Sequence, residues 1–189
     1  MGILCEADQA LFASLQAANV LEDIQPHRLE VDGGIILVSC SDGDQFPDVF
    51  QHMGTVLTCR GDRARIHTIA LNGGPLLLHP NSPLATHGES AVLTAHIMEA
   101  ARLKSISTVA LVAHGPCGKA YGQNLNLAQV VDLLKSGKQH LESQGAGLTV
   151  YPFGQIDIPG ARGRKRTYHV SGTRWPDWCV TNGYVSIIA

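Results

Sequence analysis

Two short apolar segments, far apart in the chain, each end in side chains that bind soft metal ions. The first covers residues 34–40 and closes with Cys40, and Asp42 lies two residues further on. The second covers residues 108–113 and is followed by His114 and then, after Gly-Pro, by Cys117. Thiolate sulfur and imidazole nitrogen are preferred zinc donors, and three of them leave a fourth position. We therefore predict that Cys40, His114 and Cys117 bind Zn²⁺, with Asp42 as a candidate fourth ligand.

The elements that must bring these side chains together are strands of a parallel sheet. Short continuous apolar runs are typical of strands buried on both faces, and helical spacing of apolar residues separates them. Strand, helix, strand, helix in this order predicts an α/β fold with right-handed crossovers. Such sheets place their sites at the carboxyl ends of the strands, where Cys40 and His114 lie. We predict strands over residues 35–39, 66–71 and 109–113 and helices over 44–53, 89–104 and 124–137.

The two ends of the chain extend this pattern. Residues 6–24 carry apolar residues at helical spacing before Pro26, which predicts a helix that packs on the sheet or on a second subunit. After Gly145 we predict three strands with no helix between them, as antiparallel edge strands or a hairpin. These strands cover residues 149–151, 167–170 and 184–188.

Composition sets the class of protein. Hydrophobic residues make up 44% of the 189 residues and charged residues 16%, which is enough to build a core. A net charge of −2 lacks the basic footprint of a nucleic-acid-binding protein, and we interpret the basic run Arg162–Arg166 as a solvated loop. No apolar stretch approaches the roughly 20 residues of a membrane span. Five scattered cysteines favour metal binding or free thiols in a reducing, cytoplasmic compartment over a disulfide framework.

The motifs resemble those of a known family. Cys40-x-Asp42 together with His114-x-x-Cys117 is similar to the β-class carbonic anhydrases, in which Cys, His and Cys bind zinc. The segment 70–74 (Ala-Leu-Asn-Gly-Gly) resembles a strand ending of that family, and Cys117-Gly118 matches its Cys-Gly. The resemblance covers roughly residues 30–122.

The resemblance implies a fold and an activity. The expected fold is a mainly parallel sheet flanked by helices, with antiparallel edge strands from the C-terminal third. It forms one domain over residues 1–189, with a helical extension at 1–28 and a divergent segment at 145–189. The expected assembly is a homodimer or higher homo-oligomer in which the N-terminal helix reaches across the partner. The implied activity is hydration of CO2 to bicarbonate, or of a similar small heterocumulene, by zinc-bound hydroxide. Asp42 would be the catalytic residue that orients this hydroxide.

One departure from the family pattern leaves an alternative open. The family has Cys-x-Asp-x-Arg, and here Asp44 stands in place of the arginine that holds the aspartate off the metal. Asp42 could then complete a closed Cys-Asp-His-Cys site, which predicts a non-catalytic zinc protein with a structural or ligand-binding role. Alternatively, another arginine replaces the missing cation, and Arg60, Arg63 and Arg65 are the candidates. A redox dithiol of Cys40 and Cys117 is disfavoured because the chain has no C-x-x-C motif.

Overall fold

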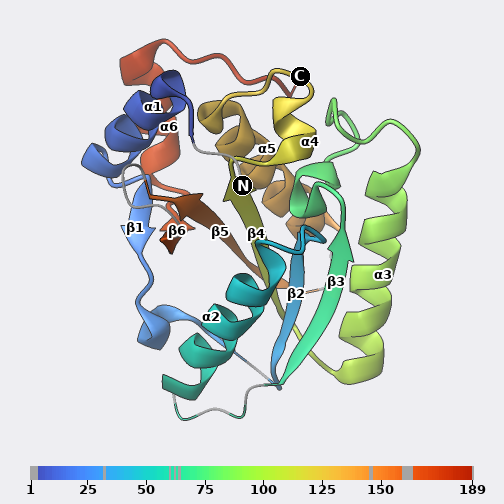
Figure 1. Ribbon diagram of the computed structural model, residues 1–189. Helices are drawn as coiled ribbons and strands as arrows, with labels where there is room; N and C mark the ends of the chain where they lie inside the picture. The colour runs from blue at the N-terminus through green and yellow to red at the C-terminus, as the bar shows by residue number, and fades with distance from the viewer. Residues whose placement is uncertain are drawn as a thin grey trace.

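The computed structural model describes residues 4–31, 33–59, 61, 63, 65–144, 147–158 and 164–188. Within these residues, six strands form one sheet with helices on both faces (Figure 1). The strand order across the sheet is β1-β6-β5-β4-β2-β3. The strands are β1 (Leu21–Asp23), β2 (Ile35–Cys40), β3 (Ile66–Leu71), β4 (Thr108–Gly115), β5 (Thr149–Asp157) and β6 (Lys165–Val170).

The pairing of the strands confirms the predicted fold class. Strands β5, β4, β2 and β3 run parallel to one another, whereas β6 is antiparallel to β5 and β1 is antiparallel to β6. Strands β2 and β4 are direct neighbours, with Ser39 opposite Val112. Every residue of both strands is buried, as the continuous apolar runs predict. The carboxyl ends of β2 and β4 therefore lie side by side.

The helices divide unequally between the two faces of the sheet. Helix α2 covers one face, where Val49 and Met53 pack with Leu37 and Phe153. The opposite face is covered by α1, α3, α5 and α6, whose buried residues form one apolar cluster with that side of the strands. The helices are α1 (Glu6–Ala17), α2 (Phe46–Cys59), α3 (Glu89–Lys104), α4 (Gly118–Tyr121), α5 (Leu127–Ser143) and α6 (Arg174–Asn182), with 3₁₀ turns η1 (Pro26–Arg28) and η2 (Gly74–Leu77).

The helix predicted over residues 6–24 is too long. It ends at Ala17, and Asn19 has a positive φ of 53° that turns the chain into strand β1. Strand β1 pairs with β6, which apolar periodicity within residues 6–24 could not predict. Phe12 and Leu15 are buried in the core of the same chain, which agrees with the predicted packing on the sheet; contact with a second subunit stays a prediction.

Two other helix boundaries differ from the prediction. The helix predicted over 44–53 continues through Gly54 to Cys59, since Val56 and Leu57 extend its buried face. A mid-helix glycine costs only about 1 kcal/mol relative to alanine, which this burial offsets. The helix predicted over 124–137 begins at Leu127, after the Asn126 N-cap of a capping box, and ends at Ser143.

The C-terminal segment corrects the prediction most. Helix α6 lies between the second and third predicted strands, so the prediction of no helix there is wrong. Its Trp175 and Trp178 are buried and stacked, with ring centroids 5.2 Å apart. Residues 184–188 are not a strand. The backbone N–H of Ile187 donates to Asp132 Oδ2 at 2.9 Å, so a buried side chain of α5 holds this segment. None of the helices in the described ranges is both long and apolar enough to cross a membrane.

Candidate metal centre

The structure brings Cys40, His114 and Cys117 together. Their ligand atoms all lie within 4.8 Å of one another, and each residue is buried, with exposures of 5%, 4% and 4%. Cys40 is the last residue of β2 and His114 lies in β4. Cys117 follows after the Gly115–Pro116 peptide bond, which is cis. The adjacency of β2 and β4 therefore produces the cluster that the spacing of the sequence predicts.

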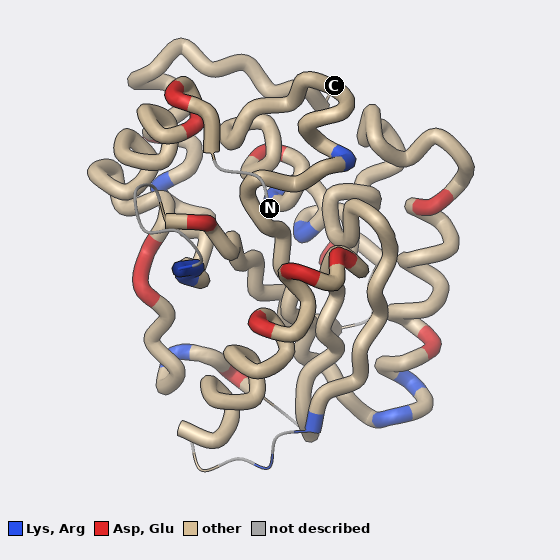
Figure 2. Tube along the Cα trace, in the orientation of Figure 1, with Lys and Arg blue, Asp and Glu red and all other residues tan. Residues whose placement is uncertain are grey.

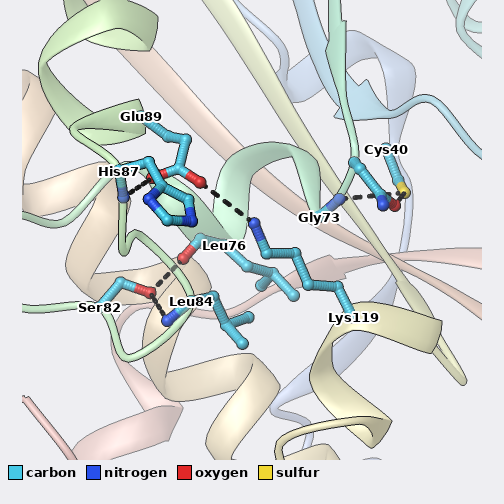
Figure 3. Close-up of polar contacts among 9 residues, drawn as sticks. Cys40, Gly73, Leu76, Ser82, Leu84, His87, Glu89 and Lys119 are labelled. Carbon is cyan, nitrogen blue, oxygen red and sulfur yellow. Dashed lines mark hydrogen bonds and ion pairs between the residues drawn. The ribbon is translucent and has the colours of Figure 1, made fainter.

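The turn after β3 holds Cys40 from the other side. The backbone N–H of Gly73 donates to Cys40 Sγ at 3.3 Å (Figure 3). Gly74 has a φ of +51°, and a Cβ on it would lie 2.7 Å from the carbonyl oxygen of Ser39 and closer still to the backbone N of Cys40. Only glycine allows so close an approach of two backbones. The Gly73-Gly74 pair is visible in the sequence, but its contact with Cys40 is not.

Both sulfurs accept backbone hydrogen bonds. Cys40 Sγ accepts from the N–H groups of Gly73 and Asp42, and the sulfur of Cys117 accepts from Lys119 and Ala120. The hydrogen bond from Cys117 is the largest cause that lowers the pKa of Cys40, to about 4. The same bond and burial raise the pKa of Cys117. The two sulfurs are therefore hydrogen-bonded to each other, and a cation bound between them would replace the proton of that bond.

His114 lacks a hydrogen-bond partner outside the cluster among the described residues. Neither Nδ1 nor Nε2 bonds to a group outside the cluster within the described residues, although both atoms are buried; inside the cluster the imidazole faces Cys40 and helps to lower the pKa of that thiol. Buried polar atoms are bonded in the large majority of cases, so an imidazole without partners needs an explanation. A metal ion held by the two sulfurs would satisfy one ring nitrogen. One nitrogen and two sulfurs form a donor set that fits zinc and does not fit magnesium or calcium.

Asp42 lies beside this cluster and is not a member of it. It is half-buried, and its Oδ1 accepts the backbone N–H of Asp44 at 2.9 Å. Arg65, one candidate for the missing cation, binds the carbonyl oxygens of Gly33 and Lys104 at the amino end of the sheet, so it does not serve this role. Arg63 precedes the same strand, β3. Arg60 lies outside the described residues.

A cation that contacts the backbone of Asp44 comes from the run that we predicted to be a solvated loop. Lys165 is the first residue of β6, and its side chain is only 7% exposed. Its ammonium donates to Asp48 Oδ2 at 2.7 Å and to the carbonyl oxygen of Asp44. Lys165 and Arg166 lie in β6, so the prediction of a loop is wrong for both, whereas Arg164 is exposed and outside any strand, as predicted. Arg162 and Gly163 lie outside the described residues. The predicted strand began two residues too late to include Lys165.

A second cation borders the cluster from the α3 side. Lys119 Nζ lies 3.4 Å from Glu89 Oε1, and Glu89 Oε2 accepts the backbone N–H of His87 at 2.6 Å (Figure 3). That bond from His87 is the largest cause that lowers the pKa of Glu89. The stem of Lys119 packs against Gly73, since a Cβ there would lie 2.9 Å from Lys119 Cδ. The turn that holds Cys40 is thus covered by a basic side chain, which the sequence did not predict.

No protein-family model and no curated protein matches the sequence. Among solved structures, the chain is similar to a β-carbonic anhydrase of Trichomonas vaginalis, with 12% identity, a TM-score of 0.43 and coverage of 86% of this chain and 96% of that one. A carbonic anhydrase of Streptococcus mutans has 12% identity and a TM-score of 0.43, with coverage of 90% and 100%. A β-carbonic anhydrase of Aspergillus fumigatus has 16% identity and a TM-score of 0.36, with coverage of 93% and 91%. Similarities this low do not by themselves place the chain in that family.

Proposed function

We propose that this protein binds one Zn²⁺ through Cys40, His114 and Cys117 and hydrates CO2, or a similar small heterocumulene, as a carbonate-dehydratase-like lyase. The observation that carries the proposal is the buried group of two sulfurs and an imidazole whose nitrogens have no other partner among the residues that the structure describes. Backbone N–H groups on both sulfurs stabilise them as thiolates, the form that binds metal. When bound, zinc with an open fourth position lowers the pKa of a bound water toward about 7.

The chain's own residues would orient and assist the reacting groups. The backbone N–H of Asp44 holds the Asp42 carboxylate through Oδ1, and we propose that Oδ2 accepts a hydrogen bond from the reacting water. Engagement of Oδ1 within its own turn argues for an open site over a closed Cys-Asp-His-Cys site. Lys119, paired with Glu89 on the rim, offsets part of the negative charge of two thiolates and favours an anionic product.

Metal content and activity test this function separately. The purified protein should carry about one zinc per chain by elemental analysis, and Cys40→Ser and His114→Ala should each lose most of it. Cys179→Ser is the matched control, because this thiol lies on α6 away from the cluster. Full zinc content in both ligand variants would contradict the metal site. Stopped-flow CO2 hydration then tests the reaction, and a zinc-loaded protein without activity would contradict the catalytic part alone.

We also propose that the protein forms a homodimer through the outer edge of β3. Strand β3 ends the sheet and has no strand neighbour on its outer side among the described residues. Leu71, Val92 and Leu103 lie beside this edge with exposures of 36%, 50% and 58%. An unpaired strand edge with apolar neighbours favours pairing with a second copy.

The five cysteines are all free thiols, which agrees with our proposal of a reducing, cytoplasmic compartment.

A further inference from the structure

A second candidate site lies under α2, apart from the three metal-binding side chains. An open pocket of about 560 Å³ separates α2 from strands β5 and β6. Gln155 of β5 and Thr167 of β6 contribute to its wall from the sheet, and His52 contributes from α2. This volume lies within the range of small-molecule sites, roughly 300–1,000 Å³.

The register of the sheet relates this pocket to the metal centre. Gln155 is the register partner of His114 on β4 and of Thr167 on β6. Neighbouring residues in register point to the same face of a sheet, so these three side chains form a row across three strands. The row faces α2, because Phe153, two residues before Gln155, packs with the α2 residues. A molecule in the pocket would therefore lie next to the strand that carries His114.

Two residues that line the pocket each carry a buried polar atom without a partner among the described residues. Gln155 is 2% exposed, and its Oε1 is buried without a hydrogen bond within the described residues. Nε2 of His52 is also buried without a hydrogen bond within the described residues. Burial lowers the pKa of His52 below its ordinary value, so this imidazole is neutral at pH 7. A buried acceptor without a hydrogen bond is unfavourable, and a ligand with a donor group would supply the missing bond.

The charges around the pocket favour a carboxylate and disfavour a polyanion. Three basic residues, Arg164, Lys165 and Arg166, and one acidic residue, Asp48, line it among the described residues. Lys165 is paired with Asp48 at 2.7 Å and Arg166 with Asp23 at 2.5 Å. Figure 2 shows basic residues at the start of β6 and acidic residues around the start of α2. The surplus of positive charge is therefore small and centres on the start of β6.

We propose that this pocket binds a small organic carboxylate that carries a hydroxyl or amino group. The carboxylate meets the basic residues at the start of β6, and the hydroxyl or amino group donates to Gln155 Oε1. The buried Oε1 of Gln155, which has no partner among the described residues, favours such a ligand over a carboxylate without a donor group. The proposal does not depend on zinc, because none of the three candidate metal ligands is among the residues that line the pocket.

Three probes with the same carbon skeleton test the proposal. Succinate offers two carboxylates and no donor, L-malate adds a hydroxyl and L-aspartate adds an amino group. We expect isothermal titration calorimetry on the full chain to show malate or aspartate binding about tenfold more tightly than succinate, as expected for one recovered hydrogen bond. Titrations run on zinc-loaded protein and again after chelation should give the same affinities, which separates this site from any carboxylate bound by the metal.

Variants locate the binding. Arg164→Gln, on the rim, should weaken all three probes about tenfold. Gln155→Met, of similar volume, should remove the preference for malate and aspartate over succinate. Arg174→Gln is the matched control, because this exposed arginine lies on α6 and is not among the lining residues. Circular dichroism confirms that each variant folds, and if Gln155→Met does not fold, Arg164→Gln decides. No binding of any probe, equal affinity for succinate and malate, loss of binding on chelation, or no effect of Arg164→Gln would each overturn the proposal.

Discussion

The contact between Gly74 and β2 gives a prediction whose magnitude follows from the structure. Gly74 has a positive φ, and a Cβ on it would overlap the backbone of Ser39 and Cys40. An alanine in the left-handed region costs about 1–2 kcal/mol. The overlap is with backbone atoms of a fully buried strand, which cannot rotate away, and overpacking of this kind adds about 1–3 kcal/mol. We expect Gly74→Ala to lower the free energy of unfolding by about 2–5 kcal/mol.

Two other glycines separate the components of this cost. Gly183, after α6, has a φ of +60° and no atom within 4 Å of an added Cβ, so Gly183→Ala should cost only the backbone strain of about 1–2 kcal/mol. Gly54 lies inside α2 with open space around it, so Gly54→Ala should stabilise the protein by about 0.5–1 kcal/mol. The three variants thus differ in strain and overlap while each adds the same methyl group.

Urea unfolding with a shared m-value measures the three changes, and zinc content measures the effect on the site. The methyl group added by Gly74→Ala must displace the backbone of residue 74 or of Cys40 by several tenths of an ångström. Metal–ligand distances vary by only about 0.2 Å around their usual values. The zinc occupancy of this variant should therefore fall, and the occupancy of the two control variants should not. If Gly74→Ala costs no more than Gly183→Ala and keeps its zinc, the turn after β3 does not hold Cys40 in place and the reasoning fails.

Two further predictions concern pH and assembly. Burial lowers the pKa of His169 below its ordinary value of 6.5, so the unfolded chain binds the proton more tightly and stability should fall as pH drops below about 6.5. The urea midpoint of the native protein should then decrease between pH 7 and pH 5.5, and by less in His169→Gln; identical pH dependence in both proteins would contradict this cause. Size-exclusion chromatography with light scattering should show a dimer, and Leu103→Lys at the β3 edge should weaken it at least tenfold. Val180→Lys, at an exposed site on α6, is its control, and equal dissociation in both variants would exclude the β3 edge as the interface.

Local sequence patterns predict those elements whose own residues show apolar spacing and have turn residues next to them. Strand β3 and helix α3 match their predicted ranges because the apolar spacing lies within each segment and glycines lie next to it. Helix α6 and strand β1 were missed for the opposite reason. Strand β1 has three residues and exists through pairing with β6, and α6 is stabilised by two tryptophans that pack on the rest of the core. Contacts distant in sequence decide such short elements.

The candidate site shows the same division. The sequence alone determined which side chains could bind a metal, because two apolar strands ending in Cys40 and in His114-x-x-Cys117 place the donors at one edge of a parallel sheet. Only the tertiary structure decided what surrounds them. Gly74 against Cys40, Lys165 beside Asp44 and Gln155 in register with His114 each join residues at least 34 positions apart. Such neighbours depend on strand order and register, which no local pattern encodes.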